Sequence, residues 1–241
     1  MALAAAARAS PANPDPRLIV ALDFPDRPQA DRIVERLSDA VSFYKIGLQL
    51  LAAGGMEIAR ELKGDGRRVF LDWKLHDIGA TVEKATAAIA ASGACDFLTV
   101  HAEPQVLAAA VRGRAGAPFA ILGVTVLTSL SEADLAEIGY DRSLEALVER
   151  RVRQVIEAGA DGVIVSPREA ALARRVGGPG LAVVTPGVRP EWAAADDQAR
   201  AETPLLALRA GASHIVCGRP ITAAADPVAA ARAIAEEMAA A

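Results

Sequence analysis

Short apolar runs rich in β-branched residues recur eight times along this chain, and a longer alanine- and arginine-rich stretch follows most of them. The runs are LIVALD (18–23), FYKIG (43–47), VFLDWK (69–74), FLTVHA (97–102), FAILGV (119–124), DGVIVS (161–166), LAVVT (181–185) and SHIVCG (213–218). Amphipathic helix candidates lie between them at 27–37, 48–62, 77–92, 103–112, 143–158, 167–175 and 222–239. Strands that are apolar on both faces and alternate with helices are typical of parallel βα units.

The number of repeated units predicts the fold class. Eight units favour an α/β protein built as a closed (β/α)8 TIM barrel, and 241 residues suit one such domain. An open, doubly wound sheet is the alternative topology. No linker divides the chain, so we expect one barrel domain at 17–241. Residues 1–16 are alanine-rich and then broken by proline, which predicts a disordered tail.

Composition excludes several classes of protein. Hydrophobic residues make up 52% of the chain, enough for a large core, yet no apolar run approaches the ~20 residues that span a bilayer. A net charge of -4 argues against a nucleic-acid surface, which needs a concentrated basic patch. The two cysteines, Cys95 and Cys217, stand far apart in apolar contexts. We therefore expect a reducing, cytoplasmic location without disulfides, membrane or nucleic acid.

Polar and charged residues collect at the ends of the predicted strands, where barrel enzymes carry their chemistry. They are Asp23, Lys45, Asp72 with Lys74, Thr128, Arg189, and Gly218 with Arg219. Alone, the D-x-K pair at 72–74 reads as a structural ion pair, although side chains two apart on a strand share a face. Unpaired charges near a barrel axis are costly, so alternating signs predict a mutually neutralising network with a strong local field.

The last part of the sequence predicts a phosphate site. The motif CGRPIT (217–222) places a glycine and an arginine between a strand and a helix, where backbone N–H groups and a guanidinium can hold an anion. Barrels commonly bind phosphate after strands 7 and 8. The stretch at 185–204 ahead of it lacks clear periodicity, which predicts either a functional lid or a disordered loop.

Seven motifs together resemble the orotidine 5'-phosphate decarboxylase family, in its bacterial branch, from about Leu18 to the C-terminal helix. They are ALD, YKIG, D-x-K-x-x-D-I with Thr81, VTVLTS, TPGVRP, DDQ-x-R and GRPIT, in family order and spacing. The family usually has a His followed by two glycines after strand 4, whereas this chain reads HAEPQ (101–105).

The resemblance implies decarboxylation of orotidine 5'-phosphate to UMP, with neither cofactor nor metal. By position, Lys74 would be the proton donor, flanked by Asp72 and Asp77 as further catalytic residues. The implied substrate-binding residues are Asp23, Lys45 and Thr81 at the ribose, Thr128 at the pyrimidine, and Arg189, Gln198, Gly218 and Arg219 at the phosphate. In such families Asp77 and Thr81 cross a two-fold interface, so the resemblance implies a homodimer with shared sites. A helix-capping Asp77 in a monomer is the alternative.

The implied reaction would explain the close-set charges. Loss of CO2 from C6 leaves a carbanion that no adjacent carbonyl can delocalise, so its stabilisation must come from electrostatics and desolvation. Two other functions remain open. A metal-dependent relative, such as a sugar-phosphate decarboxylase or aldolase, would need a carboxylate at the end of strand 2, where Lys45 stands. A non-catalytic phosphate-binding barrel would not need Lys74 between two carboxylates.

Overall fold

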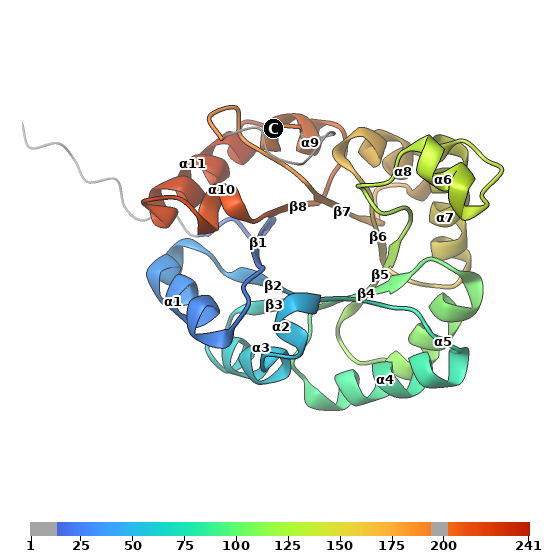
Figure 1. The fold of residues 1–241 in the computed structure, drawn as a ribbon, viewed down its shortest axis with the longest axis horizontal. Coiled ribbons are helices and arrows are strands. Elements are labelled where there is room, and N and C mark those ends of the chain that lie inside the picture. Colours follow the sequence, from blue (N-terminus) through green and yellow to red (C-terminus); the bar gives the residue numbers. More distant parts are fainter. Residues whose placement is uncertain (1–13, 194–201) are drawn as a thin grey trace, which may run out of the picture.

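Eight parallel strands close into a barrel in this computed structural model, which describes residues 14–193 and 202–241 (Figure 1). Each strand pairs with the next along the chain, and the first pairs with the last. The strands are β1 (Leu18–Leu22), β2 (Phe43–Gly47), β3 (Arg68–Leu75), β4 (Phe97–His101), β5 (Ala120–Val124), β6 (Gly162–Ile164), β7 (Ala182–Pro186) and β8 (His214–Cys217). The predicted (β/α)8 barrel is confirmed, and the open sheet is wrong.

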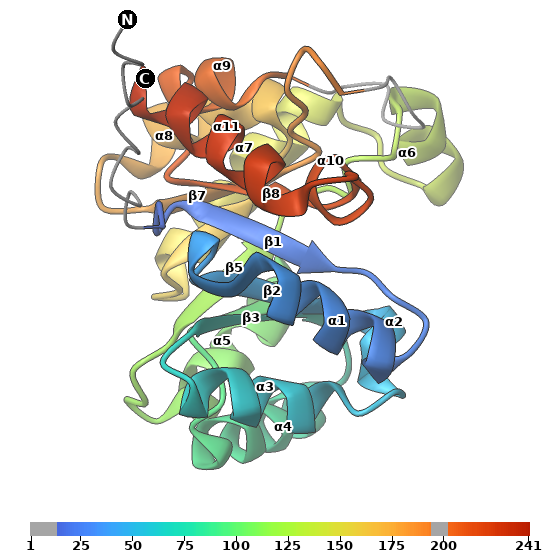
Figure 2. The ribbon, with the colours of Figure 1, turned by 90° about the vertical axis from the view of Figure 1, so that its left-hand side faces the viewer.

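Helices surround the strands on the outside (Figures 1 and 2). They are α1 (Arg27–Leu37), α2 (Leu48–Leu51), α3 (Gly55–Gly64), α4 (Gly79–Ser92), α5 (Pro104–Arg114), α6 (Glu132–Ile138), α7 (Leu144–Glu157), α8 (Ala170–Gly177), α9 (Pro204–Arg209), α10 (Arg219–Thr222) and α11 (Pro227–Ala239). The single helix expected at 48–62 is two helices: α2 ends at Leu51, and Gly54, in a left-handed conformation (φ 89°), turns the chain into the start of α3. No helix of the described residues is long and apolar enough to cross a membrane.

Two apolar cores hold the barrel. One lies between the strands and the surrounding helices, and the other fills the barrel itself. The interior core contains Phe43, Phe70 and Phe97 from three consecutive strands, and the rings of Phe43 and Phe97 meet edge to face at 5.1 Å. A barrel interior packed in this way is solid rather than a pore, so a ligand can enter only at an end.

The two ends of the barrel domain meet at the β1–β8 seam. The backbone N–H of Ile215 donates to the carbonyl of Arg17 at 3.0 Å, and the Arg17 guanidinium donates to the carbonyl of Met238 in α11 at 3.2 Å. Asp15, inside the predicted tail, accepts a hydrogen bond from Arg17 at 2.7 Å. Residues 1–13 of that tail lie outside the described residues, so its disorder stays a prediction.

A partly buried histidine lies at the amino-terminal end of the barrel. The His214 ring packs edge-on against Phe97, with ring centres 5.0 Å apart, and the Arg68 guanidinium lies 4.0 Å from the centre of the Phe43 ring. Burial, assisted by the positive charge of Arg68, lowers the pKa of His214 from 6.5 to about 4. The folded protein therefore keeps this imidazole neutral under conditions in which an unfolded chain protonates it.

Replacing His214 by Phe should make the protein less sensitive to acid. Between pH 6.5 and about 4 the unfolded wild-type chain takes up a proton that the folded chain does not, so wild-type stability falls over this window. The pKa shift corresponds to a loss of about 3 kcal/mol in the free energy of unfolding over this window, and His214→Phe should not show that loss. Urea unfolding of both proteins at pH 7.5 and 4.5 measures this difference. Equal losses would contradict the assignment.

Candidate active site

A cavity of about 350 Å³ opens at the carboxyl ends of the strands. Eight of the residues predicted from sequence line it: Asp23, Lys45, Asp72, Lys74, Thr128, Arg189, Gly218 and Arg219. Asp77 and Thr81 do not line this cavity, and Gln198 lies outside the described residues. The strand-end residues that are far apart in the sequence are thus brought together around one hollow.

Four of these side chains form a row of alternating charge. The Lys45 ammonium donates to Asp23 Oδ1 at 3.0 Å and lies 3.3 Å from Asp72 Oδ2. The Lys74 ammonium donates to Asp72 Oδ1 at 2.8 Å. Lys45 is 7% exposed and Asp72 9%, whereas Asp23 is exposed at the rim. Each buried charge therefore has an opposite charge in contact, which the predicted network required.

The ionisation of the two buried groups follows from these contacts. Burial opposes the charged form of both, yet the positive charges of Lys45 and Lys74 lower the pKa of Asp72. Likewise, burial opposes the ammonium of Lys45, but the charges of Asp72 and Asp23 raise its pKa. Both groups therefore remain charged at neutral pH.

Strand β3 is irregular where Asp72 and Lys74 lie. Leu71 pairs with Leu98 and Leu75 with Val100, so four steps along β3 match two along β4. Lys74 has a positive φ of 47°, which is uncommon for a residue with a side chain. The regular strand alternation expected for Asp72 and Lys74 is therefore wrong at this point, although their side chains meet. A bulge next to a site re-aims a side chain, here the lysine.

Thr99 completes this irregular segment, and the sequence analysis missed it. Its hydroxyl accepts a hydrogen bond from the backbone N–H of Lys74 at 3.0 Å and donates to Asp72 Oδ1 at 3.0 Å. The residue is fully buried. A lone hydroxyl in the middle of the apolar run FLTVHA was the available signal, since a buried polar group needs a nearby partner.

Gly47, the glycine of YKIG, leaves space for the ion pair of Asp23 and Lys45. A Cβ at this position would lie 3.0 Å from Asp23 Oδ1 and 3.1 Å from Lys45 Nζ. A side chain of any kind would press on both charged groups. Glycine suits this position because these two side chains come close to the backbone there, and not because the chain turns.

Asp77 and Thr81 line a second hollow, together with Lys74 and His76. Asp77 Oδ1 accepts a hydrogen bond from the backbone N–H of Ile78 at 2.6 Å. Helix α4 starts two residues later, and its N-terminal cap, Ile78, has no side-chain hydrogen bond. Asp77 therefore does not make the capping bond that the monomer alternative requires. Ile78 itself is 72% exposed, unusual for a large apolar residue.

The opposite side of the cavity is formed by the turn at Gly218 and by the loop after β7. Helix α10 begins at Arg219, directly after Gly218. The stem of the loop is closed by a bridge between Val188 and Glu202, in which the Arg189 N–H donates to the Glu202 carbonyl at 2.9 Å. Arg189 and Arg219 thus lie at the same mouth as the charged row, after β7 and β8, whereas Lys74 lies on β3, distant from them around the closed ring of strands.

Comparisons with known proteins point to one family. The family described as Orotidine 5'-phosphate decarboxylase / HUMPS matches residues 16–234. The orotidine 5'-phosphate decarboxylase of Caulobacter sp. (strain K31) is 64% identical over 93% of this chain and 98% of its own length. The enzyme of the same name from Rhodopseudomonas palustris (strain BisA53) is 54% identical over 92% of this chain and 94% of its own.

Solved structures show the same likeness. The crystal structure of orotidine 5'-phosphate decarboxylase from Lactobacillus acidophilus has a TM-score of 0.82 and 36% sequence identity, and the match covers 93% of this chain and 99% of that one. An uncharacterized conserved protein from Geobacillus kaustophilus has a TM-score of 0.79 and 32% identity, over 92% and 99% of the two chains.

Replacing Thr99 by Val should destabilise the protein by about 1–3 kcal/mol, since the Lys74 N–H and one Asp72 oxygen each lose a hydrogen-bond partner in a buried place. Thr99→Ser is the matched control, because it keeps the hydroxyl and removes only a methyl group. Denaturant unfolding measures both variants. A valine variant as stable as the serine variant would mean that the hydroxyl contributes nothing.

Proposed function

This chain belongs to the Orotidine 5'-phosphate decarboxylase / HUMPS family, and we propose that its barrel mouth converts orotidine 5'-phosphate to UMP with release of CO2. The observation that carries the proposal is the Lys74 ammonium, held 2.8 Å from a buried carboxylate in a cavity at the strand ends. That arrangement supplies a proton donor inside a fixed electrostatic field, which the reaction needs.

In the proposed reaction the bond between C6 and the carboxylate breaks, and its electron pair stays on C6. The adjacent Lys74 ammonium stabilises this carbanion and then transfers a proton to C6, while CO2 leaves. Because the charges are positioned before the substrate arrives, little reorganisation is needed in the transition state. Asp72 would lie beside the departing carboxylate and hold the lysine. The chain's own residues therefore suffice, and the proposal includes no metal or cofactor.

The remaining roles are those that the resemblance to the family implies. We assign Asp23, Lys45 and Thr81 to the ribose hydroxyls and Thr128 to the pyrimidine. Gly218, together with Arg189, Arg219 and Gln198, is assigned to the phosphate. The arginines lie distant from Lys74 around the ring of strands, which supports a phosphate held away from the reacting carbon. Binding energy gained there can be used to close the site, so substrates that lack phosphate should lose rate as well as affinity.

The position of Lys45 argues against the metal-dependent relatives. Its ammonium lies within 3.3 Å of both Asp23 and Asp72, between the carboxylates that a divalent ion would need. A fixed positive charge in that place repels a second cation. The donor set therefore fits the metal-free reaction better than a magnesium-dependent one.

We also propose a homodimer with two composite sites, each completed by Asp77 and Thr81 of the opposite chain. Support comes from the exposed apolar side chain of Ile78 next to Asp77, since an exposed apolar surface favours a contact with another chain. Asp77 and Thr81 line a hollow that is separate from the cavity of the same chain, yet Lys74 borders both.

We propose the cytoplasm as the compartment. The two cysteines, Cys95 and Cys217, are buried free thiols, which suits a reducing environment.

Lys74→Ala should reduce decarboxylation to below about one ten-thousandth of the wild-type rate, because both the carbanion stabilisation and the proton donor disappear. The absorbance change on orotidylate loss measures the rate. Lys84→Ala, at an exposed position of α4, is the control and should retain activity. Both assays are run in excess chelator. Near-normal turnover by the Lys74 variant would exclude the proposed mechanism.

Mixing two inactive variants tests the shared site. Lys74→Ala and Asp77→Ala homodimers should each be nearly inactive, because every site of each carries one lesion. A heterodimer of the two has one doubly damaged site and one intact site. Co-refolding equal amounts should therefore restore about a quarter of wild-type activity, from the half of the dimers that have one intact site.

Lys74→Ala mixed with Lys74→Arg serves as the control, since no combination of these two chains can yield an intact site. A mixture of Lys74→Ala with Asp77→Ala that stays inactive, although heterodimers form, would mean that each chain builds its own site. Sedimentation of differently tagged chains establishes that the heterodimers are present.

A further inference from the structure

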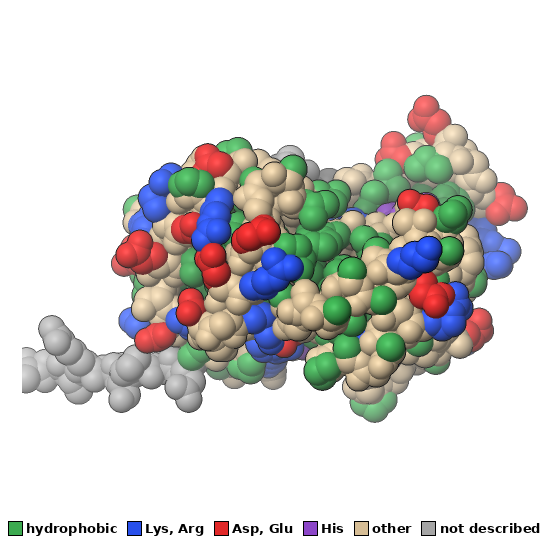
Figure 3. Space-filling view, turned by 90° about the horizontal axis from the view of Figure 1, so that it is seen from below, with side chains coloured by type: hydrophobic (Ala, Val, Ile, Leu, Met, Phe, Trp, Pro, Cys, Tyr) green, Lys and Arg blue, Asp and Glu red, His purple; other side chains and the backbone are tan. Residues whose placement is uncertain are grey.

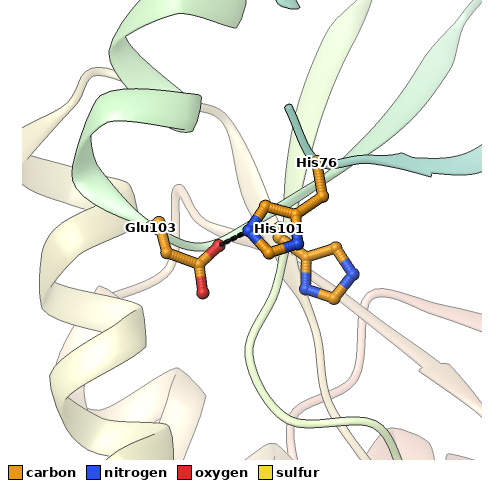
Figure 4. A group of neighbouring side chains, drawn as sticks. All are labelled: His76, His101 and Glu103. Carbon is orange, nitrogen blue, oxygen red and sulfur yellow. Dashed lines mark ion pairs between the residues drawn. The ribbon is translucent and has the colours of Figure 1, made fainter. Parts of the chain in front are cut away.

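A second cluster of chemically capable side chains lies beside the mouth, outside the set used in the proposed reaction. His76 follows β3, His101 ends β4, and Glu103 comes just before α5 (Figure 4). Figure 4 shows the Glu103 carboxylate directed at the His76 ring, with the His101 ring next to it.

The spacing of these three side chains suits a metal ion. One ligand atom from each lies within 4.8 Å of the others. His76 Nε2 and Glu103 Oε2 are 3.4 Å apart, close to the separation of about 3.3 Å between two ligands of a tetrahedral ion bound at about 2.0 Å. The rings of His76 and His101 are stacked with centres 4.6 Å apart, so one ring has to rotate about its side-chain bonds before both can direct a nitrogen lone pair at the same ion.

The carboxylate is already oriented by a neighbour. Arg151 donates to Glu103 Oε1 at 2.8 Å and to the carbonyl of Ala102 at 2.8 Å. The other oxygen, Oε2, is buried and has no hydrogen-bond partner. Its polar neighbour is His76 Nε2 at 3.4 Å, and a metal ion held between the two atoms would give this buried oxygen a charged partner. Arg151 thus resembles the outer-shell partners that orient metal ligands.

We propose that His76, His101 and Glu103 form a binding site for a divalent transition-metal ion of the zinc class. Two imidazoles and one carboxylate suit zinc and its neighbours, whereas magnesium and calcium prefer oxygen ligands throughout. In a single chain His76 is exposed, which leaves room for an ion to enter and to keep water in its remaining positions.

The site goes beyond the proposed function and shares no ligand with the charged row of Asp23, Lys45, Asp72 and Lys74. An ion there would tie the segment that follows Lys74 to the end of β4. The ion would therefore restrict the movement of the β3–α4 connection, which carries Asp77. Binding to the folded chain alone also raises the melting temperature, by an amount that grows with the logarithm of the ratio of ion concentration to Kd.

Zinc titration of the full chain, stripped of metal with chelator and then dialysed, tests the proposal by calorimetry. We expect one ion per chain, and a loss of affinity of at least about tenfold in His76→Ala and in Glu103→Gln. His214→Phe is the matched control, because it removes the chain's only other histidine and should leave binding unchanged. Cobalt in place of zinc should give visible absorption bands with the wild-type protein and not with His76→Ala.

Absence of saturable zinc uptake would overturn the site and leave an ion pair between His76 and Glu103 only. Uptake that is equally strong in His76→Ala would overturn it as well, by locating the ion elsewhere. His76 is exposed, so its alanine variant is expected to fold normally, which circular dichroism verifies. These readouts need no turnover and do not depend on whether the chain decarboxylates orotidylate.

Discussion

The Asp72 carboxylate, buried between two ammonium groups, is the interaction on which the mouth of this barrel depends. One of its oxygens accepts hydrogen bonds from Lys74 and Thr99, and the other lies within 3.3 Å of Lys45. Removing one partner of such a set leaves an uncompensated buried charge, at a cost of about 3–5 kcal/mol. The interactions that place Lys74 are therefore among those that stabilise the folded barrel. The field that the reaction uses is already part of the stability of the fold.

The scaffold beneath the charges makes them effective. The aromatic core of Phe43, Phe70 and Phe97 fills the barrel below the charged row, and water is excluded from that side. Charges interact more strongly where the surroundings are poorly polarisable. On the face of the molecule that Figure 3 shows, basic and acidic side chains are interspersed without such an order. The ordered alternation of sign is thus found at the mouth, where chemistry needs it.

The strands and most of the site could be predicted from the sequence because both depend on local pattern. All eight apolar runs became strands, and the polar residues predicted at the ends of six of them line the cavity. Irregularities in the pairing between strands were not predicted. The irregular pairing of β3 contradicts the regular alternation assumed for Asp72 and Lys74, and Thr99 matters only because that irregularity leaves the Lys74 N–H in need of an acceptor. The arrangement around Glu103 likewise needs Arg151, 48 residues away along the chain.

The seam between β1 and β8 has a consequence for the order of the chain. Arg17 contacts both Ile215 and Met238, so the beginning and the end of the barrel domain are neighbours in space. A short linker could join them, and new termini could be opened at an exposed turn such as Gly116, on the connection between α5 and β5. Such a circular permutant would keep every strand pair and every charge at the mouth. The geometry of the mouth depends on the closed ring of strands and not on the point of that ring at which the polypeptide starts.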